Sequence, residues 1–232
     1  MLKISVGREA DEALSEWYDK LLDLFFPPKC PFCRAILRKD ETALCGACRR
    51  SLPWTQGAAR IQSFRHLDKC VSPLYYEEDV RRSLLRYKFG GISVYAPKYA
   101  ELMLDALAQS EISFDLISWA PLGRKRLRRR GYDQARLLAE ALEARLGKPC
   151  PQLLVKTLDN PPQSGTSSAK QRRSNVSGVY RVTDPTLVRG ESVLLVDDIV
   201  TTGATLSECA RVLKSAGARS VSAITLARSR ID

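Results

Sequence analysis

Residues 193–205 read VLLVDDIVTTGAT, and this stretch decides the fold. The branched apolar run at 193–196 is typical of a central strand in a parallel sheet. Asp197 and Asp198 end that run, and the spacing beyond them predicts a helix at 205–216. In open α/β sheets, ligands bind outside the carboxyl ends of the strands. The stretch therefore predicts a binding site at the end of this strand.

The turn after the two acids has the features of an anion site. Backbone N–H groups and hydroxyls at the start of a helix attract phosphate, and a glycine lets the phosphate approach the backbone closely. Two carboxylates beside the turn would repel a ligand that is only a phosphate. They can, however, accept hydrogen bonds from the 2- and 3-hydroxyls of a ribose 5-phosphate. The residues predicted to bind such a phosphoribosyl group are Asp197, Asp198, Thr201, Thr202, Gly203, Ala204 and Thr205.

Strands and helices alternate around this site. Apolar runs predict strands, and 3.6-residue spacing predicts helices. The predicted strands are 71–76, 115–120, 191–196 and 221–227, and the predicted helices are 79–88, 94–108, 133–146 and 205–216. This alternation indicates the α/β class, a parallel sheet flanked by helices. The rival phosphate motifs GxxxxGK[ST] and strand-linked GxGxxG do not occur in the sequence.

Four of the seven cysteines are organised as two CxxC pairs separated by eleven residues: Cys30, Cys33, Cys45 and Cys48. Zn²⁺ prefers four such ligands in a tetrahedron, and a site with all four positions filled is structural. A redox CxxC is the alternative, but the doubling of the motif counts against it. We therefore predict a small zinc ribbon that unfolds when the metal is chelated. Residues 1–55 would contain a helix at 11–26 followed by this ribbon, and residues 56–232 would form the second domain.

The chain is strongly basic, with 37 Lys and Arg against 26 Asp and Glu in 232 residues, a net charge of +11. Residues 124–130 read RKRLRRR, six cations in seven residues. Such a balance favours nucleic acid or phosphorylated small molecules as partners. The sequence contains neither a signal-peptide pattern nor an apolar run of about 20 residues, so we expect a cytoplasmic protein without membrane insertion.

The stretch 193–205 resembles the phosphoribosyl-diphosphate signature of type I phosphoribosyltransferases. The order of motifs along the whole chain is similar to the ComF family, whose members join an N-terminal zinc ribbon to such a domain. Besides the CxxC pairs, the matching motifs are RYKFGG at 86–91, RGYDQA at 130–135, QSG at 163–165, RRSNV at 172–176 and ECA at 208–210. Two positions depart from the family pattern, Asp133 in place of Asn and Thr166 in place of Leu. The charge of Asp133 argues against contact with a diphosphate and favours a helix N-cap.

The resemblance implies further site residues. A loop at 121–131 would hold the diphosphate, and a flexible loop at 160–175 would close over the site. The candidates for these contacts are Lys88, Arg126, Arg130, Gln163, Arg172 and Asn175. Mg²⁺ would bridge diphosphate and ribose oxygens. In the catalytic role, Asp197 and Asp198 would orient the sugar and stabilise positive charge at its C1 carbon.

The resemblance also implies a role in natural transformation, with single-stranded DNA as ligand and a helicase-like DNA translocase as partner. The nucleic-acid candidates are Arg124, Lys125, Arg128 and Arg129. Tyr87, Phe89 and Tyr132 could stack on bases, although core packing is the commoner role of such residues. The alternative is an active phosphoribosyltransferase of metabolism, acting on an unidentified base or nucleotide-related acceptor.

Overall fold

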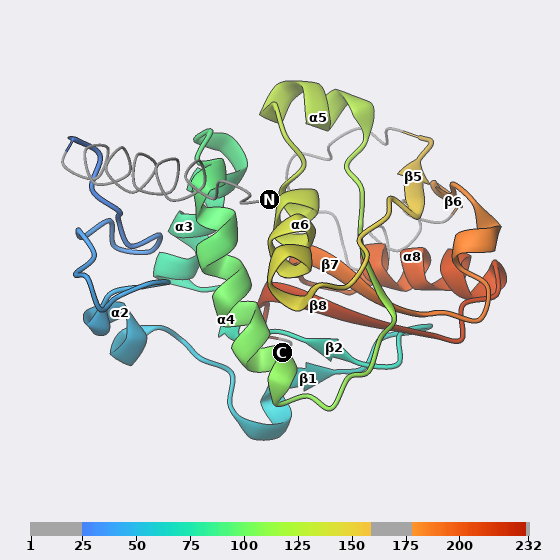
Figure 1. Ribbon diagram of the computed structural model, residues 1–232, viewed down its shortest axis with the longest axis horizontal. Helices are drawn as coiled ribbons and strands as arrows, with labels where there is room; N and C mark the ends of the chain where they lie inside the picture. Colours follow the sequence, from blue (N-terminus) through green and yellow to red (C-terminus); the bar gives the residue numbers. More distant parts are fainter. Residues whose placement is uncertain (1–24, 159–177, 231–232) are drawn as a thin grey trace, which may run out of the picture.

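The computed structural model describes residues 25–158 and 178–230 (Figure 1). The helix predicted at 11–26 lies outside these residues except for its last two positions. The flexible loop predicted at 160–175, with Gln163, Arg172 and Asn175, lies wholly outside them. Within the described part of the chain, no helix is both long and apolar enough to cross a membrane.

A six-stranded sheet forms the centre of the molecule. In spatial order its strands are β1 (Ile61–Gln62), β2 (Cys70–Val71), β8 (Ser220–Arg228), β7 (Ser192–Val200) and β4 (Leu116–Trp119), with β3 (Leu74–Tyr75) beside the end of β8. All pairings are parallel except that of β1 with β2. The register pairs Trp119 with Val196 and Val196 with Ile224, so the carboxyl ends of the central strands lie together. The predicted α/β class is confirmed.

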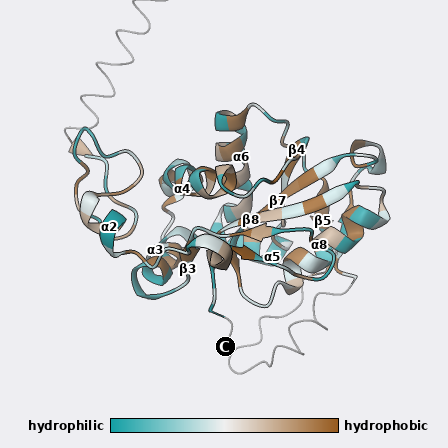
Figure 2. Cartoon of the chain, turned by 90° about the horizontal axis from the view of Figure 1, so that it is seen from below, coloured by the Kyte–Doolittle hydropathy of each residue, from teal (hydrophilic) through white to brown (hydrophobic). Residues whose placement is uncertain are grey.

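Helices cover both faces of this sheet (Figure 2). One face carries α3 (Glu78–Phe89), α4 (Ala96–Ala108) and α6 (Gln134–Leu146), and the other carries α8 (Ala204–Ser215). Side chains along β7 alternate between the two faces of the sheet. Leu194 and Val196 pack with α4 and α6, whereas Val193 and Leu195 pack with α8. Because successive strand residues point to opposite faces, a strand covered on both sides must be apolar at every position.

The smaller elements complete the described chain. A short antiparallel pair, β5 (Leu154–Lys156) and β6 (Tyr180–Val182), lies beside α8. The helix α2 (Gly46–Ser51) belongs to the cysteine-rich segment, and α5 (Arg124–Arg130) lies between β4 and α6. Single 3-10 turns occur at Gly57–Arg60, Ser93–Tyr95 and Pro185–Leu187.

The cysteine-rich segment shares its core with the sheet domain. Phe32 and Leu44 are buried in the same cluster as Leu84 of α3, and the Phe32 ring lies 5.9 Å from that of Tyr99 on α4. The Arg86 guanidinium donates hydrogen bonds to the carbonyls of Pro31 (2.8 Å) and Phe32 (2.7 Å). The predicted boundary at residue 55 therefore lies within one continuous set of packing contacts.

The predicted helices agree with α3, α4, α6 and α8 to within two residues at each end. The strand predicted at 71–76 is instead two short strands, because Pro73 has no N–H for the ladder. The loop predicted at 121–131 is wrong for Arg124–Arg130, which form α5. Arg and Leu are good helix formers, and Gly131 ends the helix at a φ of 81° by donating to the Leu127 carbonyl (2.8 Å).

Candidate phosphoribosyl site

A cavity of about 150 Å³ lies at the carboxyl ends of β4 and β7. Charged side chains from five parts of the chain meet in it. The three acids are Asp133, Asp197 and Asp198, and the four cations are Lys88, Arg126, Arg130 and Lys156. The parallel register of β4 and β7 explains why the segment after β4 meets Asp197 and Asp198, because chains that leave the same edge of a sheet emerge side by side. Lys88 comes from the end of α3 and Lys156 from the separate β5–β6 pair.

The two acids of the central stretch lie at the end of β7 rather than after it. Burial, followed by the neighbouring Asp198 carboxylate, raises the pKa of Asp197 to about 8. Asp197 Oδ1 accepts from the Asp198 backbone N–H at 2.8 Å. Asp198 is instead paired with Lys88, whose Nζ lies 3.0 Å from Asp198 Oδ1. A ligand hydroxyl that binds Asp198 thus shares this carboxylate with Lys88.

The helix α5 divides its cations between two directions. Arg126 and Arg130, one turn apart, line the cavity with Asp197 and Asp198. Arg130 donates to Gln134 Oε1 at 2.6 Å, and its buried Nε has no hydrogen-bond partner among the described residues. Burial lowers the pKa of Arg130. A half-buried guanidinium with a donor left over is suited to an incoming anion.

Asp133 has the predicted N-cap role. Its Oδ1 accepts from the N–H groups of Ala135 (3.2 Å) and Arg136 (3.3 Å) at the start of α6. Its Oδ2 accepts from the Leu122 N–H at 2.9 Å, which fixes the chain leaving β4. Burial raises the pKa of this carboxyl. Asp133 therefore shapes the cavity wall through backbone contacts.

The hydroxyl-rich turn is divided between two cavities. Thr205 lines the cavity with the acids, whereas Thr202 and Ala204 line a neighbouring cavity of about 530 Å³ that also contains Phe64. Thr201 is exposed. Gly203 has a φ of 69°, and a Cβ there would lie 2.1 Å from Cδ1 of Phe64. Gly203 thus accommodates an aromatic ring, a contact that the sequence did not suggest.

Replacing Gly203 by alanine should test this contact. We expect Gly203→Ala to lower the free energy of unfolding by about 2–3 kcal/mol, because overpacking against Phe64 adds to the cost of a positive φ. In a Phe64→Ala background the same change should cost only about 1–2 kcal/mol. Denaturant unfolding measures both values.

The control is Gly190→Ala, at a φ of 81° with nothing within 4 Å of the added Cβ. It should show the backbone cost alone in both backgrounds. Equal losses for Gly203→Ala with and without Phe64 would show that the ring does not crowd this position.

Sequence reasoning also missed two residues of the β5–β6 pair. Lys156 and Tyr180 line the cavity, and Lys156 Nζ lies 5.4 Å from the centroid of the Tyr180 ring. Each belongs to a strand of three residues, too short to show a periodicity. A local sign of the second strand is the alternation of apolar and charged side chains at Tyr180, Arg181 and Val182.

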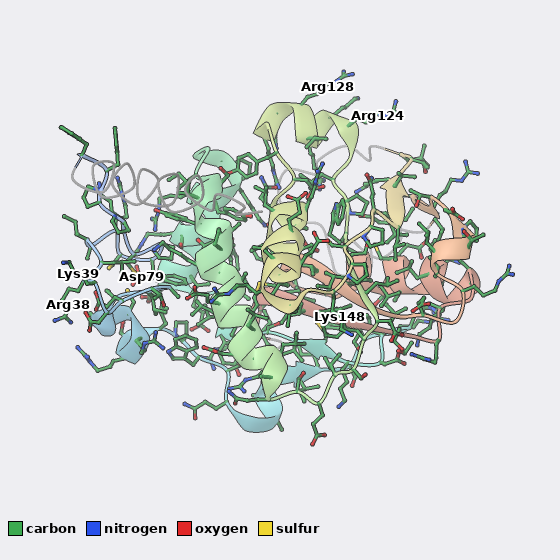
Figure 3. The ribbon with its side chains drawn as sticks, in the orientation of Figure 1. Arg38, Lys39, Asp79, Arg124, Arg128 and Lys148 are labelled. Carbon is green, nitrogen blue, oxygen red and sulfur yellow. The ribbon has the colours of Figure 1, made fainter. Side chains whose placement is uncertain are left out.

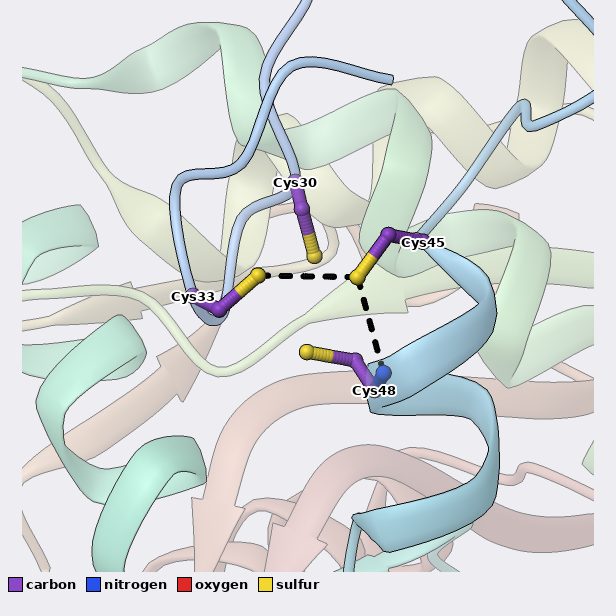
Figure 4. A group of neighbouring side chains, drawn as sticks. All are labelled: Cys30, Cys33, Cys45 and Cys48. Atoms are coloured by element: carbon purple, nitrogen blue, oxygen red, sulfur yellow. Dashed lines mark hydrogen bonds between the residues drawn. The ribbon is translucent and has the colours of Figure 1, made fainter. Parts of the chain in front are cut away.

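The four predicted metal ligands come together in the N-terminal segment (Figure 4). Their sulfur atoms all lie within 4.8 Å of one another, and those of Cys33 and Cys45 are 3.5 Å apart. A tetrahedral Zn²⁺ places its sulfur ligands about 3.8 Å from each other, so this set fits the ion. Burial, and next the Cys33 sulfur, raise the pKa of the Cys48 thiol, a penalty that a divalent cation would remove.

The nucleic-acid candidates lie on the outer side of α5. Arg124, Lys125, Arg128 and Arg129 are all exposed, and Figure 3 shows Arg124 and Arg128 projecting away from the body of the molecule. The three aromatic candidates differ. Tyr87 is fully buried, and its hydroxyl donates to the Gln134 carbonyl at 2.9 Å, so it is a core residue. Tyr132 is half-buried, and Phe89 is 58% exposed.

Chemically, the cavity combines two functions. Its cations can hold a diphosphate, and its carboxylates can accept hydrogen bonds from sugar hydroxyls or hold Mg²⁺. Backbone N–H groups hold Asp133 and Asp197, and side-chain partners hold Lys88 and Arg130. Groups fixed before the ligand binds are suited to the electrostatic stabilisation of a leaving anion and a developing cation.

Comparisons with known proteins agree with this description. Residues 129–232 match the family described as phosphoribosyl transferase domain, and residues 21–59 match the double zinc ribbon domain. The ribbon and the phosphoribosyltransferase-type domain predicted from the sequence are thus both found. The four-cysteine cluster lies within the matched ribbon, which supports a structural Zn²⁺.

Curated relatives match most of the chain. The chain is 28% identical over 229 residues to competence protein F of Haemophilus influenzae, covering 88% of this chain and 99% of the relative. It is 31% identical over 214 residues to competence protein ComFC of Bacillus subtilis, covering 86% of this chain and 84% of the relative. A solved structure of the allosteric regulatory enzyme of purine biosynthesis is similar at 22% identity over 56% of this chain and 25% of its own. The TM-score is 0.38, too low to add to the assignment.

Proposed function

Since the chain belongs to the ComF family of competence proteins, with a phosphoribosyltransferase-type domain and a zinc ribbon, we propose that it handles single-stranded DNA during DNA uptake under the control of a phosphoribosyl ligand. The ligand is phosphoribosyl diphosphate or ribose 5-phosphate with Mg²⁺. The relatives named for competence support the DNA role. Handling of incoming strands takes place in the cytoplasm, with a helicase-like translocase as partner.

The observation that carries the ligand proposal is the meeting of Asp197 and Asp198 with Lys88, Arg126 and Arg130 in one cavity. Acids alone would suit a cation, and cations alone would suit any phosphate. The two together suit a molecule that carries sugar hydroxyls and a diphosphate a few ångströms apart. Mg²⁺ would neutralise part of the diphosphate charge, and Asp197 and Asp198 are the carboxylates that would hold it.

The DNA proposal is supported by the outward side of α5. Backbone phosphates need only cations within reach, and Arg124, Arg128 and Arg129 present three on one short helix. The helix contains no acid that would oppose them. Its other side contributes Arg126 and Arg130 to the ligand cavity, so one helix serves both surfaces.

Neutralising this surface should weaken DNA binding in a salt-dependent way. We expect the triple variant Arg124→Gln, Arg128→Gln, Arg129→Gln to lower affinity for a thymidine oligonucleotide. The slope of log K against log salt concentration should become shallower by about 0.7 for each lost phosphate contact, or about 2 in total. Fluorescence anisotropy across a salt series measures both quantities.

The matched control removes the same charge elsewhere, through Arg38→Gln, Lys39→Gln and Lys148→Gln. Figure 3 shows these side chains far from α5. The control should leave the slope within about 0.7 of the wild-type value. Equal losses in both triple variants would mean that net charge, rather than α5, attracts the DNA.

A second candidate function is phosphoribosyl transfer itself, favoured by the carboxylate pair placed for a C1 cation. Diphosphate release from phosphoribosyl diphosphate, measured with and without a mixture of bases and nucleosides, tests it. Release that depends on an acceptor and disappears in Asp198→Asn would support turnover. Binding of the ligand without release would favour the ligand-controlled DNA role.

A further inference from the structure

A second cavity, of about 450 Å³, lies on the other side of α5 from the phosphoribosyl site. We propose that it receives one unpaired base of a bound single strand, while the outer cations of α5 hold the flanking phosphates. The proposal rests on the DNA role given above. The volume is within the usual range for small-molecule sites, about 300–1,000 Å³. The cavity walls include Trp119, Leu127, Tyr132, Arg136, Gln152 and the acid Glu140, which is paired with Arg136.

The geometry of α5 assigns this cavity to a ligand that also contacts cations. Arg126 and Arg130 line the phosphoribosyl site, whereas Leu127 and Gly131, one position further on, line the second cavity. Arg124 and Arg128 project outward from the same helix (Figure 3). Arg124 is one turn from Leu127 and Arg128 is the next residue, so a strand held by these outer cations is within reach of the second cavity.

The chemistry of the walls matches a planar heterocycle. Trp119 and Tyr132 supply aromatic surface, and Leu127 supplies apolar surface that is 40% exposed in a helix otherwise made of cations. The Arg136 guanidinium lies 5.9 Å from the centre of the Trp119 ring and donates to Glu140 at 2.7 Å, so it is held in place. Arg136 and the amide of Gln152 offer donors and an acceptor to a base edge.

The exposed ring of Phe89 is the other aromatic surface near α5, and it is already covered. The guanidinium carbons of Arg130 and Arg129 lie 5.0 Å and 5.9 Å from its centroid. A base stacking there would displace two cation–π contacts. In the second cavity one wall ring, that of Trp119, has such a contact, with Arg136, and the Tyr132 ring and the Leu127 side chain offer a base further aromatic and apolar contact.

The two cavities are separated by a common wall of Pro121, Leu122 and Asp133. The Asp133 carboxylate holds this wall through the Leu122 N–H. A base in the second cavity therefore does not occupy the phosphoribosyl site. Both ligands can bind at once, in contrast to a strand that places a phosphate among Lys88, Arg126 and Arg130.

The test compares a thymidine oligonucleotide with an abasic oligonucleotide of the same length and charge. We expect Leu127→Trp, which fills the cavity, to weaken binding of the thymidine strand about tenfold and to leave binding of the abasic strand unchanged. The matched control is Leu187→Trp, at a leucine 46% exposed and far along the chain. It should change neither affinity.

A second variant, Arg136→Ala, guards against disruption of α5 by the tryptophan, because Arg136 lies on α6. It should weaken the thymidine strand more than the abasic strand, because the loss of one cation affects both and the loss of a base contact affects only the first. Equal losses for both oligonucleotides, or no loss for either, would overturn the base site while leaving DNA binding intact. Failure of the wild type to bind either oligonucleotide would instead refute the DNA role. Displacement of the strand by thymidine monophosphate at equal concentration would assign the cavity to a free nucleotide and also overturn the proposal.

Discussion

Removal of the metal from the four-cysteine cluster is expected to destabilise the sheet domain as well as the ribbon. In small zinc domains, the free energy of metal binding is folding free energy, about 10–16 kcal/mol at neutral pH. That is as large as the whole stability of an ordinary domain, about 5–15 kcal/mol. Here Cys30, Cys45 and Cys48 belong to the same buried cluster as Leu84 and Tyr99. Loss of the metal is therefore expected to destabilise the core that the ribbon shares with the sheet domain.

The contact that transmits this effect is the pairing of the first CxxC turn with α3. Arg86 donates to the carbonyls of Pro31 and Phe32, and the Ser83 hydroxyl donates to the same Pro31 carbonyl. Two residues beyond Arg86, Lys88 pairs with Asp198 in the phosphoribosyl site. We expect a metal-free protein to lose order in α3 and, with it, affinity for the ligand.

Hydrogen exchange and thermal unfolding, with and without a zinc chelator, measure the effect. The variant Cys48→Ser should behave like the chelated protein, with faster exchange over residues 78–89. Cys150→Ser, a cysteine outside the cluster, is the matched control and should behave like the wild type. If exchange quickened only in residues 30–52 after chelation, the ribbon would be an independent unit.

Replacement of the carboxylate pair should remove ligand binding while leaving the fold intact. We expect Asp197→Asn with Asp198→Asn to weaken binding of phosphoribosyl diphosphate at least about 100-fold, since two hydrogen bonds to charged acceptors contribute about 1.5–3 kcal/mol each. Calorimetric titration in the presence of Mg²⁺ measures the loss. Asp105→Asn, on the exposed side of α4, is the matched control and should bind like the wild type.

The pKa of Asp197 gives this prediction a pH dependence. With a native pKa of about 8 against 3.8 in the unfolded chain, the folded protein keeps a proton that the unfolded chain releases. The contribution of Asp197 to the free energy of unfolding therefore falls as the pH rises from about 4 to about 8. Asp197→Asn should flatten that fall and raise the melting temperature at pH 8.

Ligand affinity, in contrast to the stability contribution of Asp197, should rise as the pH rises. Binding that requires ionised Asp197 grows by up to about tenfold per pH unit below pH 8 and then levels off. In the single variant Asp197→Asn the affinity should be low at every pH between 7 and 9. A wild-type affinity that stays constant over this range would show that Asp197 does not bind the ligand as a carboxylate.

Much of this molecule could be predicted from its sequence, for physical reasons. The apolar run before Asp197 and Asp198 has one explanation, a strand covered on both faces, and Val193 to Val196 are buried on both sides of the sheet. The doubled CxxC motif fixes four ligands through local turns, so their meeting needs no knowledge of the fold. Asp133 could be predicted as a helix cap because capping is a local interaction.

The parts that could not be predicted depend on contacts between distant segments. Phe64 meets Gly203, and Lys88 meets Asp198, across more than a hundred residues of chain. The run RKRLRRR is predicted as a loop because it lacks the mixed charges of a typical surface helix. It forms a helix whose one apolar residue is Leu127 and which ends at Gly131. The division of its cations between two surfaces became visible only with the helix in place.

The most direct test of the central claim is titration of the wild-type protein with phosphoribosyl diphosphate and Mg²⁺ in a calorimeter. We expect saturable binding at one site per chain, weaker binding of ribose 5-phosphate, and weaker binding again of diphosphate alone. That order follows from a cavity that holds both hydroxyls and diphosphate through Asp197, Asp198 and the cations around them. No saturable heat and no thermal shift at millimolar ligand would contradict the assignment of this cavity.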